Sequence, residues 1–133
     1  MENAFAAPRT APGFTLRQWL VVDALTCVAF GALLLSAAEP LSTLFGLPRS
    51  LLFVSGVVLL PCAALMAVAA KSLAAPLVWL VIAGNAAWIA ASIAVTWMLA
   101  LTGTGLAFVA IQAAAVALLM SLEWRALNAR AYI

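Results

Sequence analysis

One long uncharged stretch limits what this chain can become. Residues 77–101 contain no Asp, Glu, Lys or Arg. A helix needs about 20 apolar residues to cross the ~30 Å hydrocarbon core of a bilayer, so the stretch predicts a membrane-spanning helix. In its middle, residues 83–92 combine small side chains, which allow close helix packing, with the amide of Asn85 and the indole of Trp88.

Three further apolar stretches accompany it. The expected spans are residues 16–38, 50–70, 77–101 and 106–124. Hydrophobic residues make up 68% of the chain and charged residues 8%, against roughly 45–50% and 25% in soluble domains. We therefore expect an all-α protein, an up-down four-helix transmembrane bundle over residues 16–125. The ends, residues 1–15 and 126–133, are expected to be tails.

The connection between the first two spans carries helix-boundary signals. Pro40 stands where a helix would start, Gly46 where it would end, and Pro48 follows. This order is typical of a short helix. Because Leu44 and Phe45 are apolar, we expect this helix to lie at the membrane interface.

Basic residues are distributed unequally between the two ends of such a bundle. Only Arg49 falls on one side, and the other side carries Arg9, Arg17, Lys71, Arg125 and Arg130. Cytoplasmic loops of membrane proteins are enriched in Lys and Arg. The pattern predicts a multi-pass protein with both termini in the cytoplasm.

Asp23 is the most informative polar residue, since a carboxylate at the bilayer centre costs at least about 2.5–3.5 kcal/mol. At a rise of ~1.5 Å per residue, Asp23 lies ~9 Å beyond Arg17 and Asn85 lies ~12 Å beyond Leu77, so the two side chains are expected at a similar depth. Two interpretations remain open. Asn85 donates to Asp23 and joins two helices, or Asp23 binds a proton or another cation.

Two other polar groups fall inside expected spans. The indole of Trp88 needs a hydrogen-bond acceptor when buried, which a ligand or another protein group can supply. Gln112 is expected near the midplane, bonded across helices. Together, Asp23, Asn85, Trp88 and Gln112 form a candidate intramembrane polar or ligand site. Glu123 aligns with Gln112 on one helix face, but we expect it at the membrane edge in a solvated ion pair with Arg125.

Several classes of chemistry lack the residues they need. The chain has no histidine, which excludes bis-histidine haem ligation, histidine zinc sites and a histidine general base. Cys27 and Cys62 form no Cys-x-x-Cys pair. We find no catalytic triad, phosphate loop or pair of carboxylates at one depth. We therefore expect no enzyme activity, no catalytic residues, no cofactor and no metal, and a net charge of +2 gives no reason to expect nucleic acid as a partner.

The chain resembles a group of small, uncharacterised four-helix bacterial integral membrane proteins. The likeness covers residues 16–125 and is carried by Asp23, by Leu-Phe-Gly-Leu-Pro at 44–48, by Asn-Ala-Ala-Trp at 85–88, by Gln112-Ala113 and by Leu-Glu-Trp at 122–124. It implies four helices in a bacterial inner membrane and no established activity. The number of spans also resembles the small multidrug-resistance transporters, but their embedded acidic residue is a glutamate, whereas here it is Asp23.

These observations predict a non-catalytic integral membrane protein, an accessory or assembly subunit of a larger membrane complex or a homo-oligomer. Its expected partners are the lipid bilayer and other membrane subunits or itself. The alternative is a small proton-coupled transporter, or a protein that binds a lipid-like molecule such as a quinone, with Asp23 and Asn85 in the site.

Overall fold

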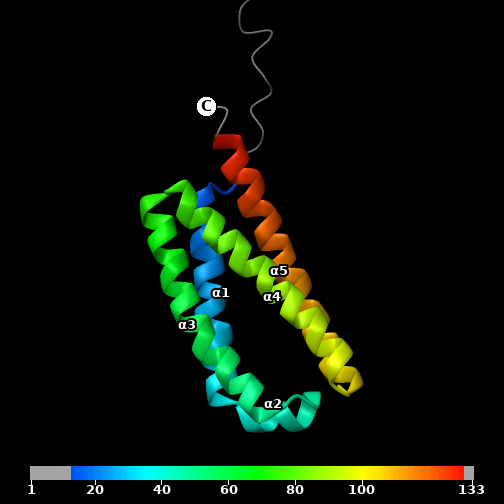
Figure 1. Cartoon of the computed structure of the whole chain (residues 1–133). Helices are drawn as coiled ribbons and strands as arrows, with labels where there is room; N and C mark the ends of the chain where they lie inside the picture. The colour runs from blue at the N-terminus through cyan, green and yellow to red at the C-terminus, as the bar shows by residue number, and fades with distance from the viewer. Residues whose placement is uncertain (1–12, 131–133) are drawn as a thin grey trace, which may run out of the picture.

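The computed structural model describes residues 13–130, which form five helices without a strand between them (Figure 1). They are α1 (Leu16–Ser36), α2 (Ala38–Phe45), α3 (Arg49–Ser72), α4 (Ala75–Met98) and α5 (Gly103–Arg130). All but α2 are long and apolar enough to cross a membrane. The expected all-α fold, an up-down four-helix transmembrane bundle with a short helix between the first two spans, is confirmed.

Local sequence signals define where the helices begin and end. Thr15 and Gln18 form a capping box at the start of α1, which pairs backbone N–H groups that a helix start leaves free. Gly46 ends α2 in the left-handed region, with φ of 70°. A Cβ at this position would lie 3.2 Å from the carbonyl oxygen of Ala100, so both the backbone conformation and the close approach favour glycine.

The four long helices form two antiparallel hairpins. α1 packs mainly on α3, and α4 packs mainly on α5. The α1–α3 contact is close because two glycines face each other, and a Cβ on Gly56 would lie 3.1 Å from the carbonyl oxygen of Gly31. Figure 1 shows the hairpins together where α1 begins and α5 ends, and further apart toward α2.

The apolar core consists of two clusters at different depths. Near the start of α1, the buried residues include Leu20, Met66 and Val81. Near α2, they include Leu34 and Phe45, and the ring of Phe45 stacks on that of Phe108 with centroids 4.2 Å apart. Asp23, Asn85 and Glu123 each lie along their helices between residues of these two clusters, so the fold places its buried polar groups between two apolar layers.

The last helix is longer than the sequence suggested. α5 continues to Arg130, past Trp124, where we expected the fourth span to end and a tail to begin. The Nη1 of Arg130 donates to the carbonyl oxygen of Leu73 at 3.2 Å, and the Nε of Arg17 donates to that of Ala70 at 2.9 Å. The beginning of α1 and the end of α5 are therefore both attached to the C-terminal end of α3, where cations interact favourably with the helix dipole.

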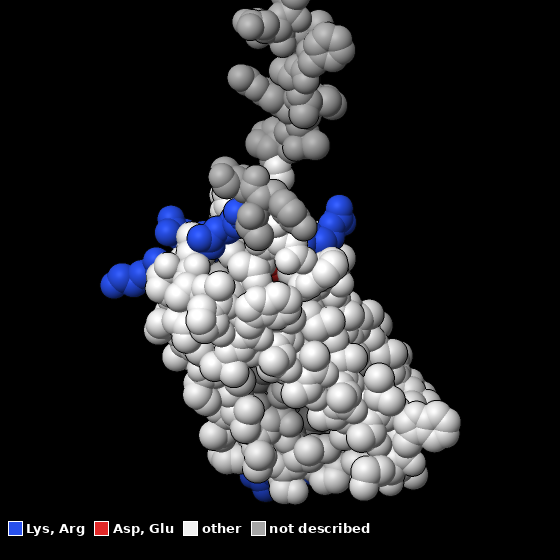
Figure 2. Space-filling model, turned by 45° about the horizontal axis from the view of Figure 1, so that its top comes forward, with Lys and Arg blue, Asp and Glu red and all other residues white. Residues whose placement is uncertain are grey.

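The basic side chains of the described residues mark the two ends of the bundle. In Figure 2, Lys and Arg gather at the end where α1 begins and α5 ends, with a smaller group at the opposite end. Between them the visible surface is almost entirely white, as expected for a surface that contacts lipid. Arg9 lies outside the described residues; for the other basic residues, this distribution agrees with the unequal placement read from the sequence.

Candidate intramembrane binding site

The centre of the polar layer is a single amide that bridges two carboxyl groups. Nδ2 of Asn85 on α4 donates to Oδ2 of Asp23 on α1 at 2.8 Å and to Oε2 of Glu123 on α5 at 3.3 Å. The exposed fractions are 6% for Asn85, 2% for Asp23 and 0% for Glu123. The expected hydrogen bond between Asn85 and Asp23 is therefore present, and it ties together three helices.

The position of Glu123 corrects our sequence interpretation. Glu123 is not in a solvated ion pair with Arg125, because it is fully buried while Arg125 is exposed. Residues two apart on a helix do not face each other, so the two side chains point in different directions. Glu123 lies on the same side of α5 as Leu119 and Leu127, which contribute to the interior of the bundle. Our statement that no two carboxylates lie at one depth was also wrong, since Asp23 and Glu123 share one amide nitrogen.

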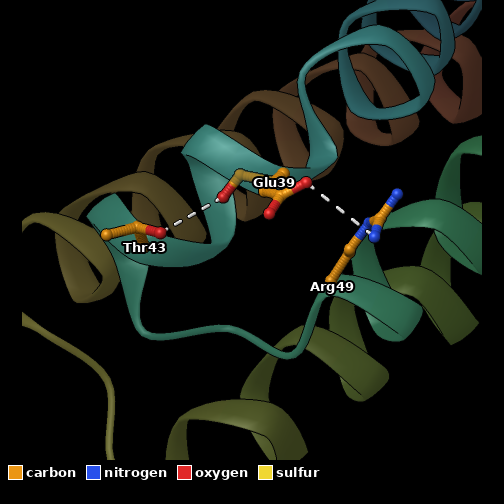
Figure 3. A network of polar contacts seen from close by, with 3 residues as sticks. All are labelled: Glu39, Thr43 and Arg49. Carbon is orange, nitrogen blue, oxygen red and sulfur yellow. Dashed lines mark hydrogen bonds and ion pairs between the residues drawn. The ribbon is translucent and has the colours of Figure 1, made fainter.

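No basic side chain of residues 13–130 compensates this pair. The ion pair found among these residues joins Arg49 to Glu39 at 3.8 Å, at the α2 end of the molecule (Figure 3). There the carboxylate of Glu39 and the guanidinium of Arg49 are both largely exposed, and the Oγ1 of Thr43 donates to the backbone oxygen of Glu39. Glu39 is thus a surface carboxylate with a cation, whereas Asp23 and Glu123 are buried carboxylates without one.

A second polar group lies one to two turns further along α4. Nε1 of Trp88 donates to Oε1 of Gln112 at 2.7 Å. Nε2 of Gln112 in turn donates to Oγ of Ser92 at 2.8 Å and to the carbonyl oxygen of Val109 at 3.0 Å. The indole therefore has a protein acceptor, and Gln112 hydrogen-bonds across helices as expected.

All four candidate residues border one cavity of about 250 Å³. The remaining lining is mostly apolar and comes from all four long helices; its members include Phe30, Leu59, Met66 and Val116. Cys27 and Cys62 also border this cavity, and the thiol of Cys27 donates to the sulfur of Met66 at 3.7 Å. A mostly apolar cavity with a few converging polar groups is the usual form of a small-molecule site.

The hydrogen bonds leave mainly acceptor atoms free toward this cavity. An Asn amide has two N–H donors, and those of Asn85 are occupied by Asp23 and Glu123. The Trp88 N–H and the Gln112 amide hydrogens are also occupied. Within residues 13–130, Oδ1 of Asp23 and Oδ1 of Asn85 receive no hydrogen bond. The polar side of the cavity is therefore suited to a group that donates.

A second cavity, of about 110 Å³, continues toward α2. Its lining includes Leu47 and Ser55, and it shares Phe30, Trp88 and Gln112 with the larger cavity. The hydrogen-bonded pair of Trp88 and Gln112 therefore stands between two spaces at different depths of the bundle.

Comparison of the chain with protein-family models, with curated proteins and with solved structures found no match. The conclusions about this molecule therefore depend on its own residues. Four long apolar helices around a buried polar layer make it a multi-pass integral membrane protein.

Proposed function

We propose that this membrane protein binds a small lipophilic molecule that carries a hydrogen-bond donor, in the cavity of about 250 Å³ beside Asp23 and Asn85. The observation that supports this most is the set of free acceptor oxygens on an otherwise apolar wall. In a hydrocarbon environment an acceptor without a partner is unfavourable by several kcal/mol. A ligand O–H or N–H group would supply the partner.

The size of the cavity limits the ligand. An engineered protein cavity of about 150 Å³ accommodates benzene, so 250 Å³ holds one ring with short substituents but no complete lipid. A longer tail would have to leave between the helices. Leu80 and Gly84 border the cavity and are exposed on the bundle surface, which places such an exit along α4.

The cavity wall offers hydrogen-bond acceptors, and this distinguishes ligands that accept hydrogen bonds from ligands that donate them. A quinone offers carbonyl oxygens, which accept hydrogen bonds and would face Oδ1 of Asp23 and Oδ1 of Asn85 without a donor between them. A quinol, a phenol or a lipid alcohol offers an O–H group that pairs with them. We therefore favour a hydroxyl-bearing ligand over the quinone named as an example from the sequence.

A matched pair of ligands tests this proposal. The protein in lipid nanodiscs is titrated with para-decylphenol and with its methyl ether, which has the same ring and tail but no donor. Binding is measured by equilibrium dialysis against empty nanodiscs. We expect the phenol to bind at least about tenfold more tightly, because a site that pairs with a hydroxyl discriminates strongly against an analogue without one. Equal partition of both compounds into protein-loaded and empty nanodiscs would refute the proposal.

The homo-oligomer expected from the sequence is the second candidate, and one observation favours it. In the most apolar stretch of α5 only 11% of the residues are buried, against 28% in each of the other three long helices. Its exposed side includes Ala107, Ala110 and Ala114, small residues that permit close approach of another helix. We infer that a second copy of the chain packs on this side of α5.

Cross-linking in membranes distinguishes this candidate from a monomer. In a variant without Cys27 and Cys62, cysteine is introduced as Ala110→Cys on α5, or as Ala86→Cys on the exposed side of α4 as the control. Oxidation is expected to give a covalent dimer with the first variant only. Monomer with both variants, or dimer with both, would contradict pairing through α5.

A further inference from the structure

We propose that Asp23 and Glu123 form a proton-binding site in which one proton, carried on Oε1 of Glu123, is donated to the carboxylate of Asp23. This inference goes beyond the ligand proposed above and does not depend on it. It concerns Glu123, which we expected from the sequence at the membrane edge and which is buried in the interior of the bundle.

Two negative charges on Asp23 and Glu123 are not compatible with this arrangement. Both carboxyl groups accept from the same nitrogen, Nδ2 of Asn85, at 2.8 and 3.3 Å, so their oxygens Oδ2 and Oε2 are neighbours around one atom. Both are almost completely buried. Two carboxylates that share one site do not both ionise, and within residues 13–130 no Lys or Arg nitrogen lies within 4.0 Å of either group.

One oxygen atom of Glu123 has no hydrogen-bond partner among the described residues. Oε1 of Glu123 is buried and has no hydrogen-bond partner among the described residues, while Oε2 accepts from Asn85. A bare carboxylate oxygen in this position lacks both water and a donor. Adding a proton converts this oxygen into a donor toward Asp23, so that the buried oxygen without a partner gains one. The pair then carries one negative charge, stabilised by two N–H groups of Asn85.

Among the described residues, the helices packed around Asp23 and Glu123 supply no other titratable group that could carry this proton. α4 contributes only the amide of Asn85, since none of its side chains titrates. α1 and α3 contribute the thiols of Cys27 and Cys62, which are neutral in their ordinary state. Of the basic residues at this end, Arg17 and Arg130 donate to backbone carbonyls of Ala70 and Leu73 instead, and Lys71 and Arg125 are exposed.

The site has contact with the cavity on one side only. Asp23 borders the cavity of about 250 Å³, and Glu123 does not. A proton that leaves the pair toward the cavity therefore passes through Asp23. Asp23 is also the residue to which a donor ligand would bind, so ligand binding and release of this proton involve the same carboxyl group.

Infrared spectroscopy of the ligand-free protein in lipid nanodiscs tests the site directly. The chain has only four carboxyl side chains, and Asp23 is its sole aspartate. A protonated carboxyl group gives a C=O band that is separate from the carboxylate and amide bands. We expect one such band at neutral pH in potassium buffer, with the intensity of a single group, and a shift of this band when the side-chain carboxyl groups of glutamate, but not of aspartate, are labelled with carbon-13.

Variants show which residues give the band. The double variant Asp23→Asn with Glu123→Gln should lose it, and Glu39→Gln, which changes the exposed carboxylate, should leave it unchanged. The isotope experiment uses the unmodified sequence, so the assignment does not depend on the double variant folding.

Three results would overturn the proposal. They are the absence of the band at neutral pH, a band that persists in a folded double variant, and a shift on aspartate labelling alone. Because no ligand is added, none of these results bears on the phenol-binding test.

Discussion

Trp88 on α4 donates through its indole N–H to the side-chain oxygen of Gln112 on α5 at 2.7 Å, and both side chains border two cavities. This hydrogen bond joins the two helices of one hairpin and at the same time separates the deeper space near Asp23 from the space near α2.

Replacing Trp88 by phenylalanine should destabilise the bundle by about 1 kcal/mol, because Oε1 of Gln112 loses its donor and interhelical hydrogen bonds in membranes are worth about 0.6–2 kcal/mol. Unfolding in lipid–detergent mixtures by increasing SDS would measure the change. Trp97→Phe is the matched control, since Trp97 is 85% exposed, and it should stay within about 0.5 kcal/mol of the original protein. Equal effects of both substitutions would mean that this hydrogen bond adds nothing to the free energy of unfolding.

Replacing Asn85 by leucine should be more damaging, by about 3 kcal/mol, because two buried carboxyl groups lose their donor at once and hydrogen bonds to charged groups contribute about 1.5–3 kcal/mol each. In the same unfolding assay, the double variant Asn85→Leu with Glu123→Leu should recover part of this loss, since one of the two stranded carboxyl groups is then absent. Strict additivity of the two substitutions would indicate that Asn85 and Glu123 do not interact.

Enlarging Gly84 should close the larger cavity without disturbing the fold. Gly84 borders this cavity, and no atom lies within 4 Å of a Cβ built on it. Gly84→Leu should therefore reduce para-decylphenol binding at least about tenfold, equivalent to 1.4 kcal/mol, with unchanged thermal stability. Ala83→Leu changes the neighbouring exposed residue, which is outside the cavity lining, and should bind as the original protein does. If both variants bind normally, the ligand occupies another place.

Enlarging Gly56 should weaken the α1–α3 hairpin. A Cβ there would lie 2.9 Å from Cγ of Leu35 and 3.1 Å from the carbonyl oxygen of Gly31, so Gly56→Val requires the two helices to separate. Overpacking of this kind costs about 1–3 kcal/mol. Gly103→Val serves as the control because nothing lies within 4 Å of its Cβ position. A Gly56→Val protein with unaltered resistance to SDS would show that the close approach is unimportant.

The cytoplasmic location of both termini remains a prediction from the basic residues at one end. A fluorescent protein that folds only in the cytoplasm, fused to either end of the chain, should fluoresce in bacterial cells. Alkaline phosphatase, which needs the periplasm, should be inactive in the same two positions. The excess of Lys and Arg on one side determines the orientation of a membrane protein. We therefore expect the reporter activities at both termini to be reversed when Arg and Lys are introduced near Arg49 and Lys71 and Arg125 are neutralised. Opposite signals at the two ends would contradict an even number of spans.

The spans and the depth of Asp23 followed from simple regularities. The length of each apolar stretch predicts a helix that crosses the bilayer, and the rise per residue places Asp23 and Asn85 at a similar level, where they do form a hydrogen bond. The break at Pro40, Gly46 and Pro48 predicts α2 because these residues restrict the backbone locally. Properties that depend on one helix at a time could therefore be predicted from the sequence.

The burial of Glu123 could not be predicted in the same way, because it depends on where α5 ends and on which side of α5 faces α4. The nearby Arg125 favoured an ion pair in sequence, but the helix turns that cation away. One signal was present: Glu123 lies four residues before Leu127 and four after Leu119, and both contribute to the interior side of the helix. The free oxygens and the cavity depend on side-chain packing among four helices, which no single stretch of sequence specifies.

The glycine contact between α1 and α3 makes the two halves of the molecule mechanically unequal. Two backbones in such close register have little freedom to slide, whereas no glycine of α4 or α5 packs against the other helix of that pair. Asp23 belongs to the stiff half, and Asn85 and Glu123 belong to the other. Rocking of one half against the other would therefore stretch the amide bridge before it disturbed any contact within the stiff half.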